Sequence, residues 1–335
     1  MNFLFILPLL GFIALQTAAQ TPKTAVALEV APPIFVLNSS DATINVIDSK
    51  TWAITQTIPT GKEPHHFYLS PDEQSLIVAN ATSDSLTLVD PRTAQVQRVI
   101  RGIRDPYHLR FSPDMKWFVT AANRLNHLDI YEWKNNQPVL KKRIPTGKVP
   151  SHLWIDSKSS TVYATMQESN ELIAVDLATQ SLLWRMKTGK MPADIFGFND
   201  DKTLLVGLTG SDGVEVLDIS GAKNGMPKRL GQITTGKGAH AFRAAGDQKH
   251  VYVSNRIANT INKLSLVTLK VVATYPGGSG PDCMEVMAST NKLLVTSRWE
   301  KKLTVIDLTS GKIERQLAVG KSPHGVWTLD HAPRL

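Results

Sequence analysis

The sequence predicts an all-β fold: a seven-bladed β-propeller made of four-stranded antiparallel blades. A similar sequence pattern occurs seven times along the 335-residue chain. It consists of a turn that contains glycine, one residue that we call the anchor, and an apolar strand that begins at this anchor. The anchors are Pro64, Pro106, Pro150, Pro192, Ala239, Pro281 and Pro323, which are 42, 44, 42, 47, 42 and 42 residues apart. A period of about forty residues with strand-like composition is typical of propeller blades.

Each repeat carries signals for three further strands after the opening one. The β-rich runs that follow the opening strand end in acidic residues, namely Asp90, Asp176, Asp218 and Asp307. Turn-forming sequences at 70–74 and 112–116 separate the first strand of a repeat from the second. Four short antiparallel strands per repeat correspond to one blade.

The two ends of the chain complete one blade. Residues 35–48 match the later strands of a repeat but lack an opening strand, whereas residues 323–329 form an opening strand with nothing after it. We therefore expect the N-terminal and C-terminal strands to pair and close the ring, because closure removes exposed strand edges.

The first nineteen residues have the composition of a secretory signal peptide. They contain no charged residue, are apolar between Phe3 and Leu15, and end in Thr-Ala-Ala before Gln20. The segment is short for a membrane span, although an uncleaved anchor is the alternative because no basic residue precedes the apolar run. We expect a signal peptide at 1–19, a linker at 20–33 and one propeller domain at 34–335. The protein is then periplasmic or secreted, without a membrane span after cleavage, and monomeric.

The net charge of +8 is concentrated at one end of the predicted propeller. Five lysines follow the turn glycines, and the loops between the second and third strands add three arginines and a tryptophan. These residues are Lys62, Lys148, Lys190, Lys237, Lys321, Arg124, Arg256, Arg298 and Trp299. A positive ring around the channel mouth predicts an anionic small molecule or an acidic protein as partner. The alternative is that the lysines are only solvated turn residues. Nucleic acid is disfavoured because no basic stretch is interleaved with aromatic residues.

The histidines are concentrated at the anchors. Six of the nine lie one or two residues after an anchor, and acids and the single cysteine hold equivalent places. The set is His65, His66, His108, His152, His240, His324, Asp194, Asp282 and Cys283. These side-chain types bind transition metals, so the sequence predicts a candidate copper or zinc site, or an axial ligand to haem iron. Adjacent strand residues point in opposite directions, so we expect at most about half of the set to face the channel. The alternative is that the Pro-His turns only satisfy backbone groups and pack between blades.

The repeats resemble those of a known group of propellers. Residues 78–90 (VANATSDSLTLVD) and 251–265 (VYVSNRIANTINKLS) resemble the YVTN-type repeats of exported bacterial proteins. Those proteins form a branch of the lactonase-like and nitrite-reductase-like propeller superfamily. The resemblance covers residues 34–330 and implies the fold, but fold does not by itself decide function.

Relatives with haem d1 suggest one chemistry. Residues 118–132 resemble part of the haem d1 domain of cytochrome cd1-type nitrite reductase, which has eight blades where this sequence supplies seven. The resemblance implies that a histidine ligates the iron and that Arg256 or Arg298 binds the carboxylates of the cofactor. The candidate ligands are His65, His108, His240 and His324.

Two other relatives suggest different chemistry. Nitrous oxide reductase has a seven-bladed propeller whose histidines hold a copper cluster, and the adjacent pair His65-His66 looks similar. The lactonases of the superfamily use an acid, an arginine and a histidine at the channel, which implies Glu168, Arg256 and His240 here.

Motifs of common enzyme classes are missing. The sequence has no GxSxG, CxxC or HExxH motif and no EF-hand loop, and one cysteine permits no intramolecular disulfide. The sequence therefore predicts an exported, non-catalytic propeller that binds a ligand or protein partner at its basic, histidine-rich rim. The alternatives are a redox or cofactor-handling protein with copper or haem d1, and a lactonase-like hydrolase.

Overall fold

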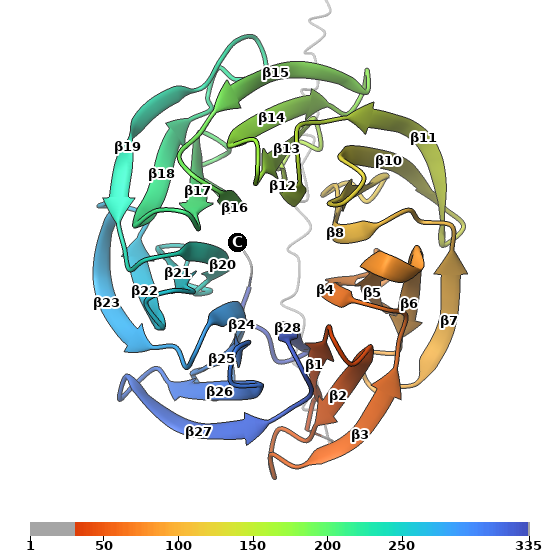
Figure 1. Ribbon diagram of the computed structural model, residues 1–335, viewed down its shortest axis with the longest axis vertical. Helices are drawn as coiled ribbons and strands as arrows, with labels where there is room; N and C mark the ends of the chain where they lie inside the picture. Colours follow the sequence, from red (N-terminus) through yellow and green to blue (C-terminus); the bar gives the residue numbers. More distant parts are fainter. Residues whose placement is uncertain (1–30, 334–335) are drawn as a thin grey trace, which may run out of the picture. The chain divides into compact units, whose positions relative to one another are not determined.

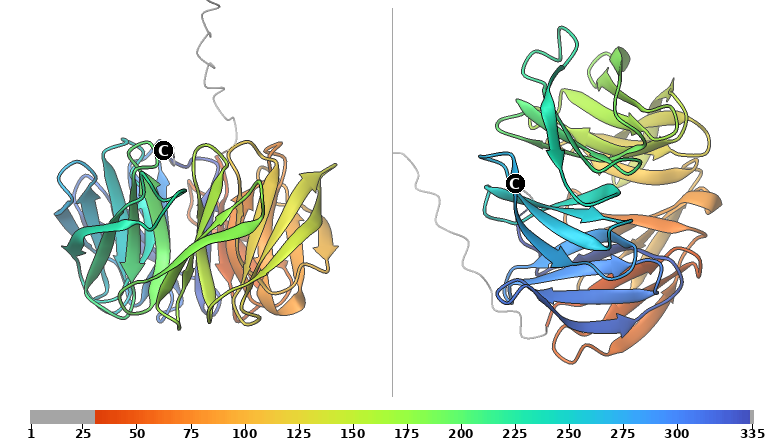
Figure 2. Two further views of the ribbon diagram at one scale, coloured as in Figure 1. Left: turned by 90° about the horizontal axis from the view of Figure 1, so that it is seen from above. Right: turned by 60° about the vertical axis from the view of Figure 1, so that its left-hand side comes forward.

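The computed structural model describes residues 31–333 and contains seven four-stranded antiparallel sheets. The predicted signal peptide, and the linker up to residue 30, lie outside the described residues. Neighbouring sheets pack side by side in a ring, with one strand of each sheet innermost (Figure 1). Seen edge-on, the strands run between two ends that carry the loops (Figure 2). The predicted seven-bladed propeller is confirmed.

The first three complete blades are built in chain order from the inside outwards. Blade 1 contains β4 (Pro64–Leu69), β5 (Leu76–Asn80), a 3-10 turn η1 (Ala81–Ser83), β6 (Ser85–Val89) and β7 (Val96–Arg101). Blade 2 contains β8 (Pro106–Phe111), β9 (Trp117–Ala122), β10 (His127–Lys134) and β11 (Gln137–Pro145). Blade 3 contains β12 (Pro150–Ile155), β13 (Thr161–Met166), β14 (Glu171–Asp176) and β15 (Ser181–Lys187).

The remaining blades follow the same order, and the last one uses both ends of the chain. Blade 4 contains β16 (Pro192–Phe198), β17 (Thr203–Leu208), β18 (Gly213–Asp218) and β19 (Lys228–Thr234). Blade 5 contains β20 (Ala239–Ala244), β21 (His250–Asn255), β22 (Thr260–Ser265) and β23 (Lys270–Pro276). Blade 6 contains β24 (Pro281–Met287), β25 (Lys292–Ser297), β26 (Lys302–Asp307) and β27 (Lys312–Ala318). Blade 7 contains β28 (Pro323–Thr328), β1 (Ile34–Asn38), β2 (Thr43–Ile47) and β3 (Ile54–Pro59).

Burial changes with the position of a strand in its blade. The second strands are buried on both faces, as in β5 and β13, because each lies between two neighbouring blades. The outermost strands are mostly exposed, but a buried apolar side chain lies near the end of several of them, such as Ile58 in β3 and Ile233 in β19. The apolar core is therefore divided into clusters between blades.

The ring closes through pairing of β1 with β28, as predicted. Phe35 lies opposite Trp327 in the register, with ring centroids 6.0 Å apart, and both side chains are buried. The turn before β28 also bonds to blade 7, because the backbone N–H of Gly320 donates to the Asn45 side-chain oxygen over 3.1 Å. A Cβ on Gly320 would come within 2.7 Å of the Cβ of Asn38, which explains the glycine.

Truncation of Trp327 tests the closure. Trp327→Ala should lower the free energy of unfolding by about 3–5 kcal/mol, because it leaves a cavity at the junction of the two chain ends. Trp299→Ala is the matched control, since that side chain is 55% exposed and its loss should change stability by about 0.5 kcal/mol or less. Urea unfolding of the two variants measures the difference. Equal destabilisation of both would contradict the closure.

Candidate functional site

The innermost strands all enter the channel in the same way. The residue before each anchor has a positive φ in all seven blades, between 45° at Asp105 and 82° at Gly238. Six of these residues precede proline, which disfavours right-handed helical backbone at that position. This left-handed turn directs the next residues of the chain into the channel.

A β-bulge follows the anchor in every blade. The register between first and second strand shifts by one residue immediately after the anchor, for example between Pro64 and Phe67 and between Pro281 and Met284. A bulge re-aims side chains that strict alternation would send to opposite faces. The expectation that only one of the two positions after the anchor faces the channel is therefore wrong.

The two positions form two stacked rings of side chains. The first ring holds the residue directly after each anchor: His65, Tyr107, Ser151, Ala193, His240, Asp282 and His324. The second ring holds the next residue of each blade: His66, His108, His152, Asp194, Ala241, Cys283 and Gly325.

The six predicted histidines form one continuous histidine cluster. Their ring centroids lie 4.7 Å apart for His65–His324 and His66–His324, and 4.5 Å apart for His66–His108. The chain of contacts continues from His108 to His152 at 4.9 Å and from His152 to His240 at 5.8 Å. Histidines from five blades thus meet on the channel axis.

Three overlapping groups in this cluster have the spacing of metal ligands. The groups are His66–His108–His152, His66–Cys283–His324 and His240–Asp282–His324, and the ligand atoms within each group lie within 4.8 Å of one another. His66 and His324 each belong to two groups. Side chains of both rings contribute, which the bulges make possible.

Hydrogen bonds fix the orientation of two imidazoles. The Nδ1–H of His324 donates to the backbone oxygen of His65 over 2.8 Å, so Nε2 carries the lone pair and has no hydrogen-bond partner. The hydroxyl of Thr209 donates to the backbone oxygen of Ala239, so it accepts from Nδ1 of His240 over 3.1 Å. A second hydrogen bond that orients the ring is the usual companion of a metal-ligating histidine.

Other cluster nitrogens are buried without a hydrogen bond. They are Nδ1 of His65, Nε2 of His66 and Nδ1 of His108. A buried polar atom without a partner costs about 1–3 kcal/mol, so these nitrogens are suited to a ligand that is not a protein group.

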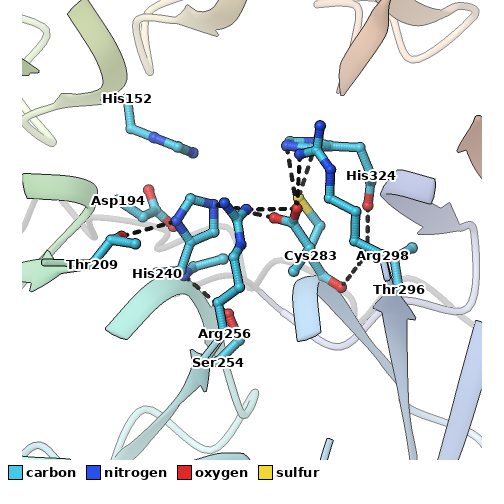
Figure 3. Close-up of polar contacts among 12 residues, drawn as sticks. His152, Asp194, Thr209, His240, Ser254, Arg256, Cys283, Thr296, Arg298 and His324 are labelled. Atoms are coloured by element: carbon cyan, nitrogen blue, oxygen red, sulfur yellow. Dashed lines mark hydrogen bonds and ion pairs between the residues drawn. The ribbon is translucent and has the colours of Figure 1, made fainter. Parts of the chain in front are cut away.

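Asp282 connects the cluster to the rim arginines. Its carboxylate accepts from Nη2 of Arg256 over 2.6 Å and from Nη1 of Arg298 over 3.2 Å. Nε2 of His240 lies 3.2 Å from the same carboxylate. Figure 3 shows His240 and Arg256 on one side of this network, with Arg298 and His324 on the other. The first ring is therefore closed towards the rim by an ion-pair network.

Burial keeps the histidines neutral. It lowers the pKa of His65 and His66 to about 3 and of His240 to about 4, and lowers the pKa of the other three well below the ordinary value. Neutral imidazole is the form that binds metals.

The acidic groups of the two rings differ. Burial alone would raise the pKa of Asp282, but the guanidinium of Arg256 holds it well below its usual range. Burial raises the pKa of Asp194 to about 6, against hydrogen bonds from the N–H groups of Phe242 and Ile195. Burial, together with Asp282 and Asp194, raises the pKa of the Cys283 thiol well above its ordinary value, so this thiol is protonated.

Some of the basic residues predicted for the rim carry unpaired charge, whereas others form ion pairs with carboxylates. All five lysines are exposed, and in the described part of the chain only Lys321 approaches a carboxylate, that of Asp41 at 3.8 Å. The arginines are paired instead: Arg124 with Glu63 and Asp105, and the other two with Asp282. Trp299 is exposed and covers Gly280.

Of the three residues that the resemblance to lactonases implies, Glu168 is not brought together with Arg256 and His240. Arg256 donates to Nε2 of His240 over 2.5 Å, but both side chains also contact Asp282. Glu168 is exposed in the loop after β13, and the described residues show no contact between it and either partner.

Three residues of the site were missed from the sequence. Tyr107 stacks on His65 at 4.6 Å, the Ser151 hydroxyl bonds Nδ1 of His152 at 2.9 Å, and Thr209 orients His240. Tyr107 and Ser151 directly follow their anchors, as His65 does, and this shared sequence position could have identified them as channel residues. Thr209 lies in a loop of the preceding blade and gives no such signal.

A small cavity lies on the far side of the histidine cluster from the rim. Its volume is about 140 Å³, and its walls include all seven residues of the second ring and none of the first. Aromatic residues further along the inner strands, such as Trp154, Phe196 and Phe242, complete it.

The donor set fits a bare metal ion and does not fit a haem. Imidazole with one thiol and one carboxylate suits copper or zinc rather than calcium or magnesium. A macrocycle does not fit the channel, because ligand pockets of that kind begin at about 300 Å³. A hollow of about 560 Å³ at the rim touches only one of the six histidines, His65, which is buried.

A seven-bladed ring with buried histidines on its axis defines a β-propeller with a candidate metal centre. The chain belongs to the family of YNCE-like β-propellers, whose model matches residues 4–334. The resemblance to the lactonase-like and haem d1-type propellers holds for the fold, because solved structures of both kinds are similar to this chain. A search of curated proteins gave no match.

Three solved structures illustrate the similarity in fold. A functionally unknown protein from Desulfotomaculum acetoxidans has a TM-score of 0.75 at 16% identity, over 88% of this chain and 98% of that one. The periplasmic gluconolactonase PpgL of Pseudomonas aeruginosa has a TM-score of 0.75 at 16% identity, over 90% and 99%. The dihydro-heme d1 dehydrogenase NirN has a TM-score of 0.68 at 15% identity, over 92% and 78%. At such identities the likeness shows the fold alone.

The neutral histidines predict a strong pH dependence of stability in the metal-free protein. Their folded-state pKa values lie below the ordinary 6.5, so the unfolded chain binds more protons once the pH falls through about 6.5. Stability should be highest above that value and fall with acidification. Each histidine that stays neutral contributes up to about 1.4 kcal/mol per pH unit.

Urea unfolding between about pH 7 and pH 5 measures this slope. His152→Phe should reduce the number of protons taken up on unfolding by about one, whereas Phe196→Leu, in the wall of the same channel, removes no titrating group and should leave the slope unchanged. A slope that does not respond to His152→Phe would show that this imidazole is not held neutral by burial.

Proposed function

We propose that the protein is an exported β-propeller that binds a transition metal ion, copper or zinc, in the histidine cluster of its channel. One observation carries this proposal: five neutral imidazoles converge in three overlapping groups whose ligand atoms lie within 4.8 Å of one another. Export is supported by the composition of residues 1–19. Among the described residues, no helix is long and apolar enough to cross a membrane.

The electrostatics of the cluster support an ion better than a structural role. If these side chains only filled space, apolar residues would give a more favourable folding free energy, because each buried imidazole nitrogen without a hydrogen-bond partner is destabilising. Neutral imidazoles at pH 7 also bind an ion without first losing protons. The carboxylate of Asp282 adds a charged ligand to one group while Arg256 and Arg298 keep it ionised.

A second candidate function is favoured by the exposed rim lysines. Lys62, Lys190, Lys237 and Lys321 accept backbone hydrogen bonds from loops on the same end of the ring, so their side chains share that end. Such a surface would attract an anionic small molecule or an acidic protein partner. The prediction that the protein carries no catalysis of its own stays a prediction, as does the monomeric state.

Metal titration tests the main proposal. The protein, cleared of metal with a chelator, should bind about one Cu²⁺ or Zn²⁺ per chain and become more stable on binding. The double variant His66→Phe with His324→Phe removes a ligand from all three groups. Its dissociation constant should rise by at least about 100-fold, since even the loss of partners that only orient ligands costs about 10–100-fold.

The matched control replaces the same number of histidines outside the cluster. The double variant His250→Gln with His331→Gln should bind the ion like the parent protein. Isothermal titration with metal analysis of the dialysed protein gives affinity and stoichiometry, and circular dichroism checks folding. A folded parent that binds no ion, or equal loss in both double variants, would contradict the proposal.

A further inference from the structure

The second ring of the channel is asymmetric. Blades 1 to 3 each contribute a histidine, whereas blades 5 and 7 contribute the smallest side chains, Ala241 and Gly325. All seven residues of this ring line the cavity. The three imidazoles therefore occupy one arc of the ring, and space is left along the rest of it.

The cavity lies next to this arc and is small. Its volume of about 140 Å³ is close to the roughly 150 Å³ cavity that is known to accept benzene, so it admits a molecule of about six non-hydrogen atoms or fewer. The residues that form the ion pairs of the first ring, Asp282 with Arg256 and Arg298, do not line this space. An ion on the histidine triad His66–His108–His152 would thus face a small space instead of a fourth protein ligand.

We propose, on the basis of the metal-binding function above, that an ion at this triad keeps an open coordination position towards the cavity, and that a small inorganic anion binds the ion there. Three protein ligands with an open position is the arrangement of catalytic rather than structural metal sites. The site then provides a place in the channel where a small substrate or inhibitor is bound by the metal.

The charge around the cavity determines the class of ligand. Three neutral imidazoles leave the charge of a divalent ion uncompensated, which favours an anion. The guanidinium of Arg110 also lines the cavity, 4.3 Å from the Trp154 ring, while it donates to the backbone oxygen of Leu153. Both oxygens of Asp194 accept backbone N–H groups, from Ile195 and Phe242, which reduces the effect of this carboxylate on a bound anion.

Azide is the probe for this open position. Added to the copper-loaded full-length mature protein, azide should produce a saturable ligand-to-metal charge-transfer band. Ala241→Leu places extra atoms in the space beside the triad and should weaken azide binding by about tenfold or more. Met284→Leu, a volume-conserving change in the same cavity wall, should leave the azide affinity within about twofold.

Copper stoichiometry is measured before azide is added, which separates the two proposals. Absence of copper from the parent protein would overturn the metal site and this inference together. Full copper loading without an azide band, or azide binding unchanged in Ala241→Leu, would overturn the open position alone. Ala241→Val repeats the test with a smaller perturbation, and circular dichroism confirms that each variant is folded.

Discussion

The pairing of β1 with β28 is the constraint on which the rest of the structure depends. It converts seven repeats into a closed ring, so that residues about forty positions apart stand side by side on a single axis. The pairing buries Phe35 against Trp327 and holds the turn at Gly320 against Asn38. Without closure, the histidines of blade 1 and blade 7 would not meet, and two of the three candidate metal groups include His324.

The channel buries polar side chains whose removal from water costs free energy. Six imidazoles and a carboxylate are buried together, and the cost is offset for Asp282 by two arginines from adjacent blades. The imidazoles have no comparable set of protein partners, and four of their nitrogens, at His65, His66, His108 and His324, lack a hydrogen bond. Real proteins break the rule of satisfied buried polar groups mainly at functional sites. This imbalance is the physical reason to regard the cluster as a binding site.

The sequence was sufficient to predict the fold and the histidines that form the cluster. It was not sufficient to predict how these side chains are directed in the channel. The period of the anchors and the two half-repeats at the chain ends predicted the blades and their closure, because both are set by local pattern. Alternation along a strand was a poor guide to the channel, since left-handed residues such as Glu63 and Val149 and the bulges after them turn both following side chains inwards. The ion pairs of Arg256 and Arg298 with one aspartate were also not predictable. They depend on how long side chains from separate loops are oriented in the folded ring.

The central claim is that the histidine cluster binds a transition metal ion. Anomalous X-ray diffraction at the zinc absorption edge, from crystals of the zinc-loaded protein, tests it most directly. The account predicts a strong peak on the channel axis, about 2.0–2.1 Å from imidazole nitrogens of the cluster. A folded, zinc-treated protein whose only peaks lie at surface residues such as His250, with the channel histidines in their present arrangement, would contradict it.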